Sequence, residues 1–161
     1  MKRISLILAT LLLAATTLSS YAQTNVNVEK AVNNIVKKHE NSTGVNCMTV
    51  VKGNGLEMIK MMLNKEFGKD FMKGVTSITI IDYSDASEDV CAVLRKDLDA
   101  FLSILKEFDV SKEKQFSDND YIRCFAAVSE SGTVSDFVIA LEDEEKSKMI
   151  MYMAGAIKVE L

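Results

Sequence analysis

The stretch that most constrains the fold runs from Val75 to Phe108, where a β-branched segment leads through an acidic turn into a long amphipathic helix. Between Val75 and Ile81, β-branched residue types favour a pleated, partly buried strand. Beyond the turn, apolar residues recur at spacings of three and four, which predicts one continuous helical stripe: Val90, Leu94, Leu98, Phe101, Leu105 and Phe108. We therefore expect the rest of the chain to be organised around this strand–helix pair.

The acidic turn between the predicted strand and helix, residues 82–89, has two interpretations. Asp85 followed three residues later by Glu88 fits a helix N-cap with its reciprocal partner, and acidic groups suit the positive end of a helix dipole. Alternating oxygen-bearing side chains also suggest a calcium loop, but the central glycine and the closing bidentate glutamate of an EF-hand are missing. We interpret these residues as helix-capping.

The first 22 residues have the three parts of a secretory signal peptide. A basic start, Met1-Lys2-Arg3, precedes an apolar stretch over residues 4–18, and Ser20-Tyr21-Ala22 fits a cleavage site after Ala22. The apolar stretch is shorter than the roughly 18 residues of a spanning helix. The other long apolar run, residues 149–157, is also too short to span a membrane. No cysteine follows the predicted cut, so we expect a soluble protein of the periplasm or the extracellular space that is not a lipoprotein.

The net charge of the chain argues against two classes of partner, and its length indicates the number of domains. Removing the signal peptide takes away Lys2 and Arg3, which leaves 17 basic and 23 acidic side chains and a net charge of −6. An acidic chain without a basic face argues against nucleic acid and against docking on an anionic membrane. We expect an N-terminal helix and linker over residues 23–44 and one α+β domain over residues 45–161, since this length suits a single core.

The remaining pattern predicts helices first and strands later. Helices are expected at 28–40 and from Asn54 to Gly68, a strand at 45–52, and four successive strands at 110–116, 121–129, 133–141 and 148–154. Short turns between those four strands imply an antiparallel meander. The predicted fold class is therefore α+β, a mostly antiparallel sheet ending in a β-meander with helices packed on one face.

The alternation within the late strands predicts which sides face the helices. Ile122, Cys124, Ala126 and Val128 are expected to face them. The opposite side of that strand would carry Tyr121, Arg123, Phe125 and Ala127, which is less polar than a solvated face should be. The last two strands are apolar on both sides, so they are either central and covered twice, or one face of the sheet meets a partner.

Two apolar patterns carry a resemblance to a known group, Ser77-Ile78-Thr79-Ile80 in the central strand and Met153-Ala154-Gly155 at the end of the meander. With the order of elements and the signal peptide, residues 45–157 resemble the exported bacterial family called domain of unknown function 4252. The resemblance implies an exported protein of this α+β fold. It supplies no catalytic residues, because the shared patterns concern burial.

No motif in the sequence favours catalysis. The one histidine, His39, lies near Cys47 in the sequence, but a thiol inside an apolar strand is normally buried and inert. No paired cysteine spacing, Gly-rich phosphate loop or nucleophile elbow is present, so we expect no catalytic residues, no metal site and no cofactor. The alternative is a small hydrolase-like enzyme that uses acidic residues near Asp82 and Asp85 in a cleft.

Three cysteines, Cys47, Cys91 and Cys124, are an odd number for an oxidising compartment. They are expected to be buried thiols that act as small hydrophobes. The alternative is one bridge between Cys47 and Cys124, if their two strands are neighbours.

The second predicted helix suggests an interaction surface. Its core stripe leaves Met58, Met61 and Met62 on the far side, where flexible thioethers either fill the edge of the core or form an adaptable apolar patch. Such a patch would combine with the uncovered face of the sheet, which we predict to carry Tyr121, Arg123 and Phe125 as further binding residues. The sequence thus favours a non-enzymatic envelope protein that binds a protein partner or itself.

Overall fold

The computed structural model describes residues 27–67, 72–108, 122–128, 133–143 and 147–156, without the side chains of residues 62, 63 and 65–67. Three helices and six strands make up this part of the chain. In chain order they are α2 (Val28–His39), β1 (Asn46–Val51), α3 (Asn54–Phe67), β2 (Gly74–Asp82), α4 (Glu88–Leu102), β3 (Lys106–Phe108), β4 (Ile122–Val128), β5 (Val134–Glu142) and β6 (Lys148–Ala156).

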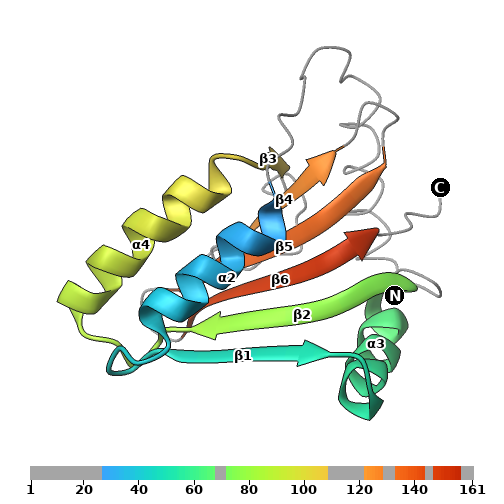
Figure 1. The fold of residues 1–161 in the computed structure, drawn as a ribbon, viewed down its shortest axis with the longest axis horizontal. Coiled ribbons are helices and arrows are strands. Elements are labelled where there is room, and N and C mark those ends of the chain that lie inside the picture. The colour runs from blue at the N-terminus through green and yellow to red at the C-terminus, as the bar shows by residue number, and fades with distance from the viewer. Residues whose placement is uncertain (1–26, 68–71, 109–121, 129–132, 144–146, 157–161) are drawn as a thin grey trace.

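All six strands form one antiparallel sheet in the order β1-β2-β6-β5-β4-β3, which Figure 1 shows from the side of α2 and α4. Strands β4, β5 and β6 follow one another as neighbours, so the predicted antiparallel meander is confirmed for them. The last two strands lie in the middle of the sheet, which explains why both are apolar on two sides. The strand predicted at residues 110–116 lies outside the described residues.

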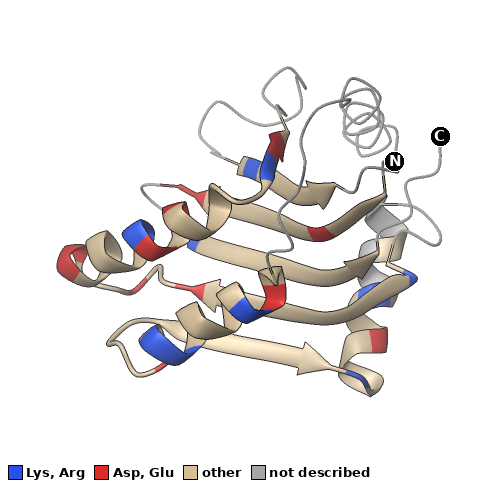
Figure 2. Cartoon of the chain, turned by 45° about the horizontal axis from the view of Figure 1, so that its top comes forward, with Lys and Arg blue, Asp and Glu red and all other residues tan. Residues whose placement is uncertain are grey.

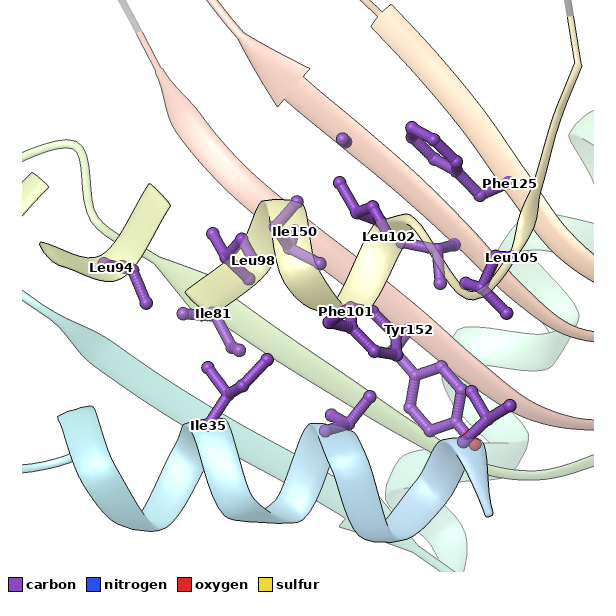
Figure 3. Close-up of a cluster of buried hydrophobic side chains, with 14 of the residues drawn as sticks. Ile35, Ile81, Leu94, Leu98, Phe101, Leu102, Leu105, Phe125, Ile150 and Tyr152 are labelled. Carbon is purple, nitrogen blue, oxygen red and sulfur yellow. The ribbon is translucent and has the colours of Figure 1, made fainter. Parts of the chain in front are cut away.

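The sheet has a hydrophobic cluster on each face. Helices α2 and α4 cover one face, where Leu94, Leu98 and Phe101 of α4 meet Ile150 and Tyr152 of β6 (Figure 3). We call this the helix face. Leu56 of α3 belongs to the other cluster, with Ile78, Phe137 and Met153. Two helices therefore share a face as expected, whereas α3 packs on the opposite side.

The face assignment predicted for β4 is wrong. Phe125 and Ala127 lie on the helix face, while Cys124 and Ala126 belong to the cluster on the other side. Both sides of this strand are apolar, so its alternation carries little information about which side faces the helices. Contacts with the neighbouring strands and with α4 decide which side faces the helices.

The long helix ends earlier than its apolar stripe predicts. Helix α4 stops at Leu102, and the stripe residues Leu105 and Phe108 are buried beyond it, Phe108 within β3. At the other end the N-cap is Ser87, whose side chain makes no capping hydrogen bond, and Asp85 is exposed. The predicted Asp85 cap is therefore wrong, although Glu88 and Asp89 do fall in the first turn, where they favour the helix dipole.

Candidate interaction surface

Helix α3 turns two methionines toward solvent. Leu56 is buried against the sheet, and at about 100° per residue Met58 and Met61 fall on the opposite side of the helix. Their side chains are 61% and 58% exposed. The side chain of Met62, which the sequence placed in the same patch, lies outside the described residues.

Strand β1, which precedes α3, exposes two more large apolar side chains. Met48 is 51% exposed and Val51 is 62% exposed. The two elements are in contact, because Val50 of β1 packs against the cluster that contains Leu56 of α3. The backbone of Gly55 also lies close to Val50, since a Cβ added to this glycine would be 3.5 Å from Cγ1 of Val50. The periodicity of the sequence gave no reason to select Met48 or Val51, since their exposure follows from the position of β1 at the edge of the sheet.

These four side chains, Met48, Val51, Met58 and Met61, lie on two elements in contact and make up what we call the β1–α3 surface. Met48 shares the sheet face of Val50 and α3, whereas Val51 alternates to the helix face, so the surface includes both sides of the sheet edge. Among the described residues the structure gives only one further exposed large hydrophobic side chain, Val93 on α4. From Met48, a row of half-buried apolar side chains continues across the sheet through the paired residues Ile80, Met151 and Ile139. Exposed apolar area on this protein is therefore gathered on two neighbouring elements, as at binding surfaces.

In the other half of the predicted patch, Phe125 is not on an exposed surface. Phe125 is only 2% exposed and packs in the cluster of the helix face beneath α4. Its predicted place in an exposed binding patch is therefore wrong. Arg123 lies with its guanidinium carbon 4.7 Å from the centre of the Phe125 ring and is paired with Glu107, at 2.6 Å between Nε and Oε1. Tyr121 lies outside the described residues.

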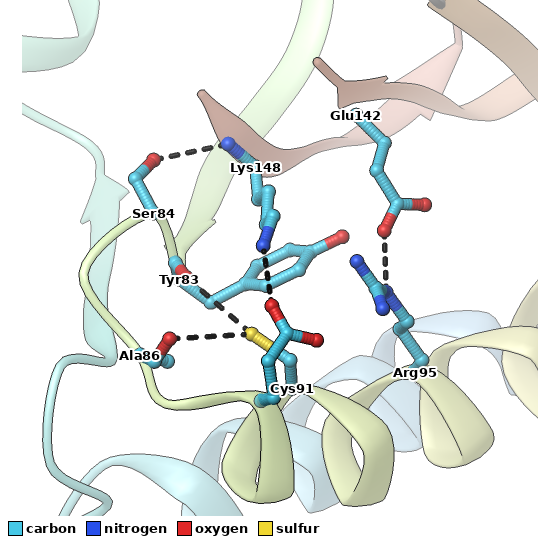
Figure 4. A network of polar contacts seen from close by, with 8 residues as sticks. Tyr83, Ser84, Ala86, Cys91, Arg95, Glu142 and Lys148 are labelled. Atoms are coloured by element: carbon cyan, nitrogen blue, oxygen red, sulfur yellow. Dashed lines mark hydrogen bonds and ion pairs between the residues drawn. The ribbon is translucent and has the colours of Figure 1, made fainter. Parts of the chain in front are cut away.

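The acidic turn after β2 stabilises its own loop. One carboxylate oxygen of Asp82 accepts hydrogen bonds from the backbone N–H of Ser84 at 3.0 Å and from its hydroxyl at 2.7 Å. The same hydroxyl accepts from the backbone N–H of Lys148 on β6 at 3.0 Å, which ties the turn to the sheet (Figure 4). This arrangement assigns Asp82 a structural task, and the side chain of Asp85 is exposed.

The rest of this network also serves packing. Arg95 of α4 pairs with Glu142 of β5, and the Cys91 thiol donates to the carbonyls of Tyr83 and Ala86 at 3.9 and 3.6 Å (Figure 4). Burial, followed by the negative charge of Glu142, raises the pKa of Tyr83 to about 12. The phenol therefore stays protonated near neutral pH, as a buried side chain of the helix face would.

The single histidine joins the two helices of the helix face. His39 ends α2, is 3% exposed, and its Nε2 lies 2.6 Å from Oδ2 of Asp97 on α4. Lys38 Nζ approaches the same oxygen at 2.7 Å. Hydrogen bonds from Lys38 and then from His39 hold the pKa of Asp97 below its usual value. His39 is thus part of a clamp between α2 and α4.

This clamp predicts a stability change that depends on pH. Replacing Asp97 by Asn should lower the free energy of unfolding at pH 7 by about 1–3 kcal/mol, because buried His39 loses a charged partner. A lowered folded pKa means that the carboxylate stabilises above its unfolded pKa of about 3.9 and that this gain is lost as pH falls through the folded pKa. Urea unfolding at pH 7 and pH 3 measures both effects.

The matched control is Asp99→Asn, an exposed carboxylate on the same helix. It should change stability by no more than about 0.5 kcal/mol at either pH. Equal losses for Asp97→Asn at pH 7 and at pH 3 would contradict the clamp.

The proposed bridge between Cys47 and Cys124 is wrong. Strands β2, β6 and β5 lie between β1 and β4, and the two cysteines face opposite clusters. A disulfide needs Cα atoms within about 7 Å, and strands are about 4.8 Å apart. All three thiols are free. Burial raises the pKa of Cys124 to about 12, so this thiol behaves as a small hydrophobe.

Three further findings bear on function. Among the described residues, no group of three or more His, Cys, Asp or Glu side chains is placed to hold a metal ion. None of the described helices combines the length and the apolar character needed to cross a bilayer. Comparison with protein-family models, with curated proteins and with solved structures found no match to this chain.

Proposed function

We propose that this protein is an exported, non-enzymatic binding protein of the cell envelope, and that it recognises a protein through the β1–α3 surface. The observation that carries the proposal is the gathering of Met48, Val51, Met58 and Met61 on two elements in contact. Transfer of such side chains from water to a partner is favourable at about 25 cal/mol per Å² of apolar area.

The chemistry of the surface suits a protein partner. Methionine side chains are unbranched and polarizable, so Met58 and Met61 adapt to more than one partner shape. The chain has 23 acidic against 19 basic side chains, which disfavours a polyanionic partner such as a nucleic acid. Export rests on the signal-peptide pattern of residues 1–22, and kinship with domain of unknown function 4252 stays a prediction.

The double substitution Met58→Gln with Met61→Gln tests the role of α3. Glutamine has nearly the same length and a good helix propensity, so it removes apolar character while keeping the helix. We expect loss of self-association or of partner capture, measured by cross-linking of the exported protein in intact cells, with the free energy of unfolding changed by less than about 1 kcal/mol.

Val93→Gln is the matched control, because Val93 is 53% exposed on α4, away from the surface. It should leave the cross-linked species unchanged. If the double variant unfolds, the two methionines are core residues, and if it folds and keeps its cross-linked species, the proposed surface has no role in binding.

A further inference from the structure

In the part of the chain that the structure describes, no strand pairs with the outer side of β1. In the described sheet β1 is the outermost strand and pairs with β2 alone, in an unbroken register from Asn46 to Val51 (Figure 1). Three of the other four strand pairings contain a register shift, which bends a strand locally. The outer side of β1 therefore presents a regular row of backbone N–H and C=O groups, which is a template for another strand.

Strand β1 has none of the sequence features that usually prevent an edge strand from pairing with another strand. Proteins usually protect an edge strand with charged residues, proline or a bulge. The sequence of β1, Asn-Cys-Met-Thr-Val-Val, contains neither charge nor proline, and Figure 2 shows the strand without a charged residue along it. At the opposite edge, β3 has two charged residues among its three, Lys106 and Glu107, and Glu107 is paired with Arg123. The two edges of one sheet thus differ in protection.

We propose that β1 is the pairing strand for a second copy of this chain, so that two sheets join edge to edge through antiparallel β1 strands. The inference rests on the proposed function, because it names the partner of the β1–α3 surface. The absence of charge suits a second copy. In a two-fold pair the residue on the axis lies opposite its own copy and the residues beside it lie diagonal to theirs, so a charge near the middle of the strand would meet a like charge. Strand β1 has none.

The alternation of side chains limits the register of this pair. Antiparallel strands related by a two-fold axis keep their faces on the same side, so residues of the helix face meet residues of the helix face. With the axis at Thr49, Cys47 lies opposite Val51 of the second copy and Met48 lies opposite Val50 of the second copy. Apolar pairs then form on both faces, and the exposed side chains of Met48 and Val51 become covered.

The first experiment places charge on the edge. The chain without its predicted signal peptide, residues 23–161, should be in a concentration-dependent monomer–dimer equilibrium by sedimentation velocity. Met48→Lys with Val51→Lys should weaken the dimer at least about 10-fold, as edge lysines do by repelling each other. Both side chains are exposed, so the circular dichroism spectrum and the midpoint of thermal unfolding should stay near those of the unsubstituted chain. Val93→Lys, equally exposed on α4, should dimerise normally.

The second experiment reads the register with the native thiol of Cys47. In the register centred on Thr49, a cysteine at position 51 lies opposite Cys47 of the second copy, so Val51→Cys should form a disulfide-linked dimer under mild oxidation. The two positions are four residues apart on one strand, about 13 Å, so they cannot bridge within a chain. Burial raises the pKa of Cys47, and oxidation is therefore run at alkaline pH. Adding Cys47→Ser should abolish the link.

Each other outcome overturns the inference. A monomer at all concentrations up to about 1 mM would show that the edge does not pair with itself. A dimer that survives Met48→Lys with Val51→Lys, or a disulfide that persists after Cys47→Ser, would place the contact or the register elsewhere. If Met58→Gln with Met61→Gln abolishes self-association but Met48→Lys with Val51→Lys leaves it intact, edge pairing is overturned while the proposed function stands. If neither pair of substitutions affects any complex, both fail.

Discussion

Replacing Phe125 by Ala should lower the free energy of unfolding by about 3–5 kcal/mol. The ring is 2% exposed and lies close to Leu102 and Leu105 in the cluster on the helix face (Figure 3). Truncation removes a large buried apolar surface and leaves a cavity that the rigid sheet cannot collapse into. It also removes the aromatic face beneath the guanidinium of Arg123. Urea unfolding followed by far-ultraviolet circular dichroism measures the loss.

This variant decides between the two roles considered for Phe125. The control is Val93→Ala on the exposed side of α4, which should change stability by no more than about 0.5 kcal/mol. A Phe125→Ala protein of unaltered stability that had lost its binding partner would restore the expectation from the sequence, in which this ring lies on an exposed face. A large loss of stability supports its place in the core.

Gly155→Ala should cost about 3 kcal/mol or more, through two effects at one position. Gly155 of β6 has φ of +107°, where L side chains are strained. A Cβ there would also lie 2.3 Å from the carbonyl oxygen of Gly74 on β2, and that backbone takes part in the pairing of β2 with β6. Relief of the clash requires β2 and β6 to move apart beside the bulge at Val75 and Ser77.

A second glycine separates the two effects. Gly53 has φ of +134°, but nothing lies within 4 Å of a Cβ placed on it. Gly53→Ala should therefore show the backbone strain alone, about 1–2 kcal/mol. Thermal and urea unfolding of both variants give the difference, which reports the close approach of β2 and β6. Equal costs at the two positions would contradict a steric role for Gly155.

Much of the secondary structure was predictable, because it depends on local periodicity. The strand that precedes the acidic turn, the helix after it and the meander β4–β5–β6 all appear where the alternation of apolar residues places them. The end of α4 was not predictable in this way. Leu105 and Phe108 continue the helical spacing, yet they are buried just as well outside the helix, so their pattern cannot distinguish the two conformations.

The candidate surface was predictable only in part. Met58 and Met61 were identified from the helical wheel, because Leu56 fixes which side of α3 faces the core. Met48 and Val51 could not be identified, since a strand with the same residues in the middle of a sheet would bury them. The assignment of Phe125 to a binding face failed for a related reason. Both sides of β4 are apolar, and a shift by one residue exchanges them.

The sequence by itself determined most of the helices and strands, though not the end of α4 or the start of β3, and which side of each amphipathic helix is apolar, because those properties are set by neighbours within a few residues. The tertiary structure alone decided the order of the strands, and with it the distance between Cys47 and Cys124, the burial of Phe125 and the open edge at β1. Strand order depends on contacts between segments far apart in the chain. These contacts leave no local pattern in the residues that make them.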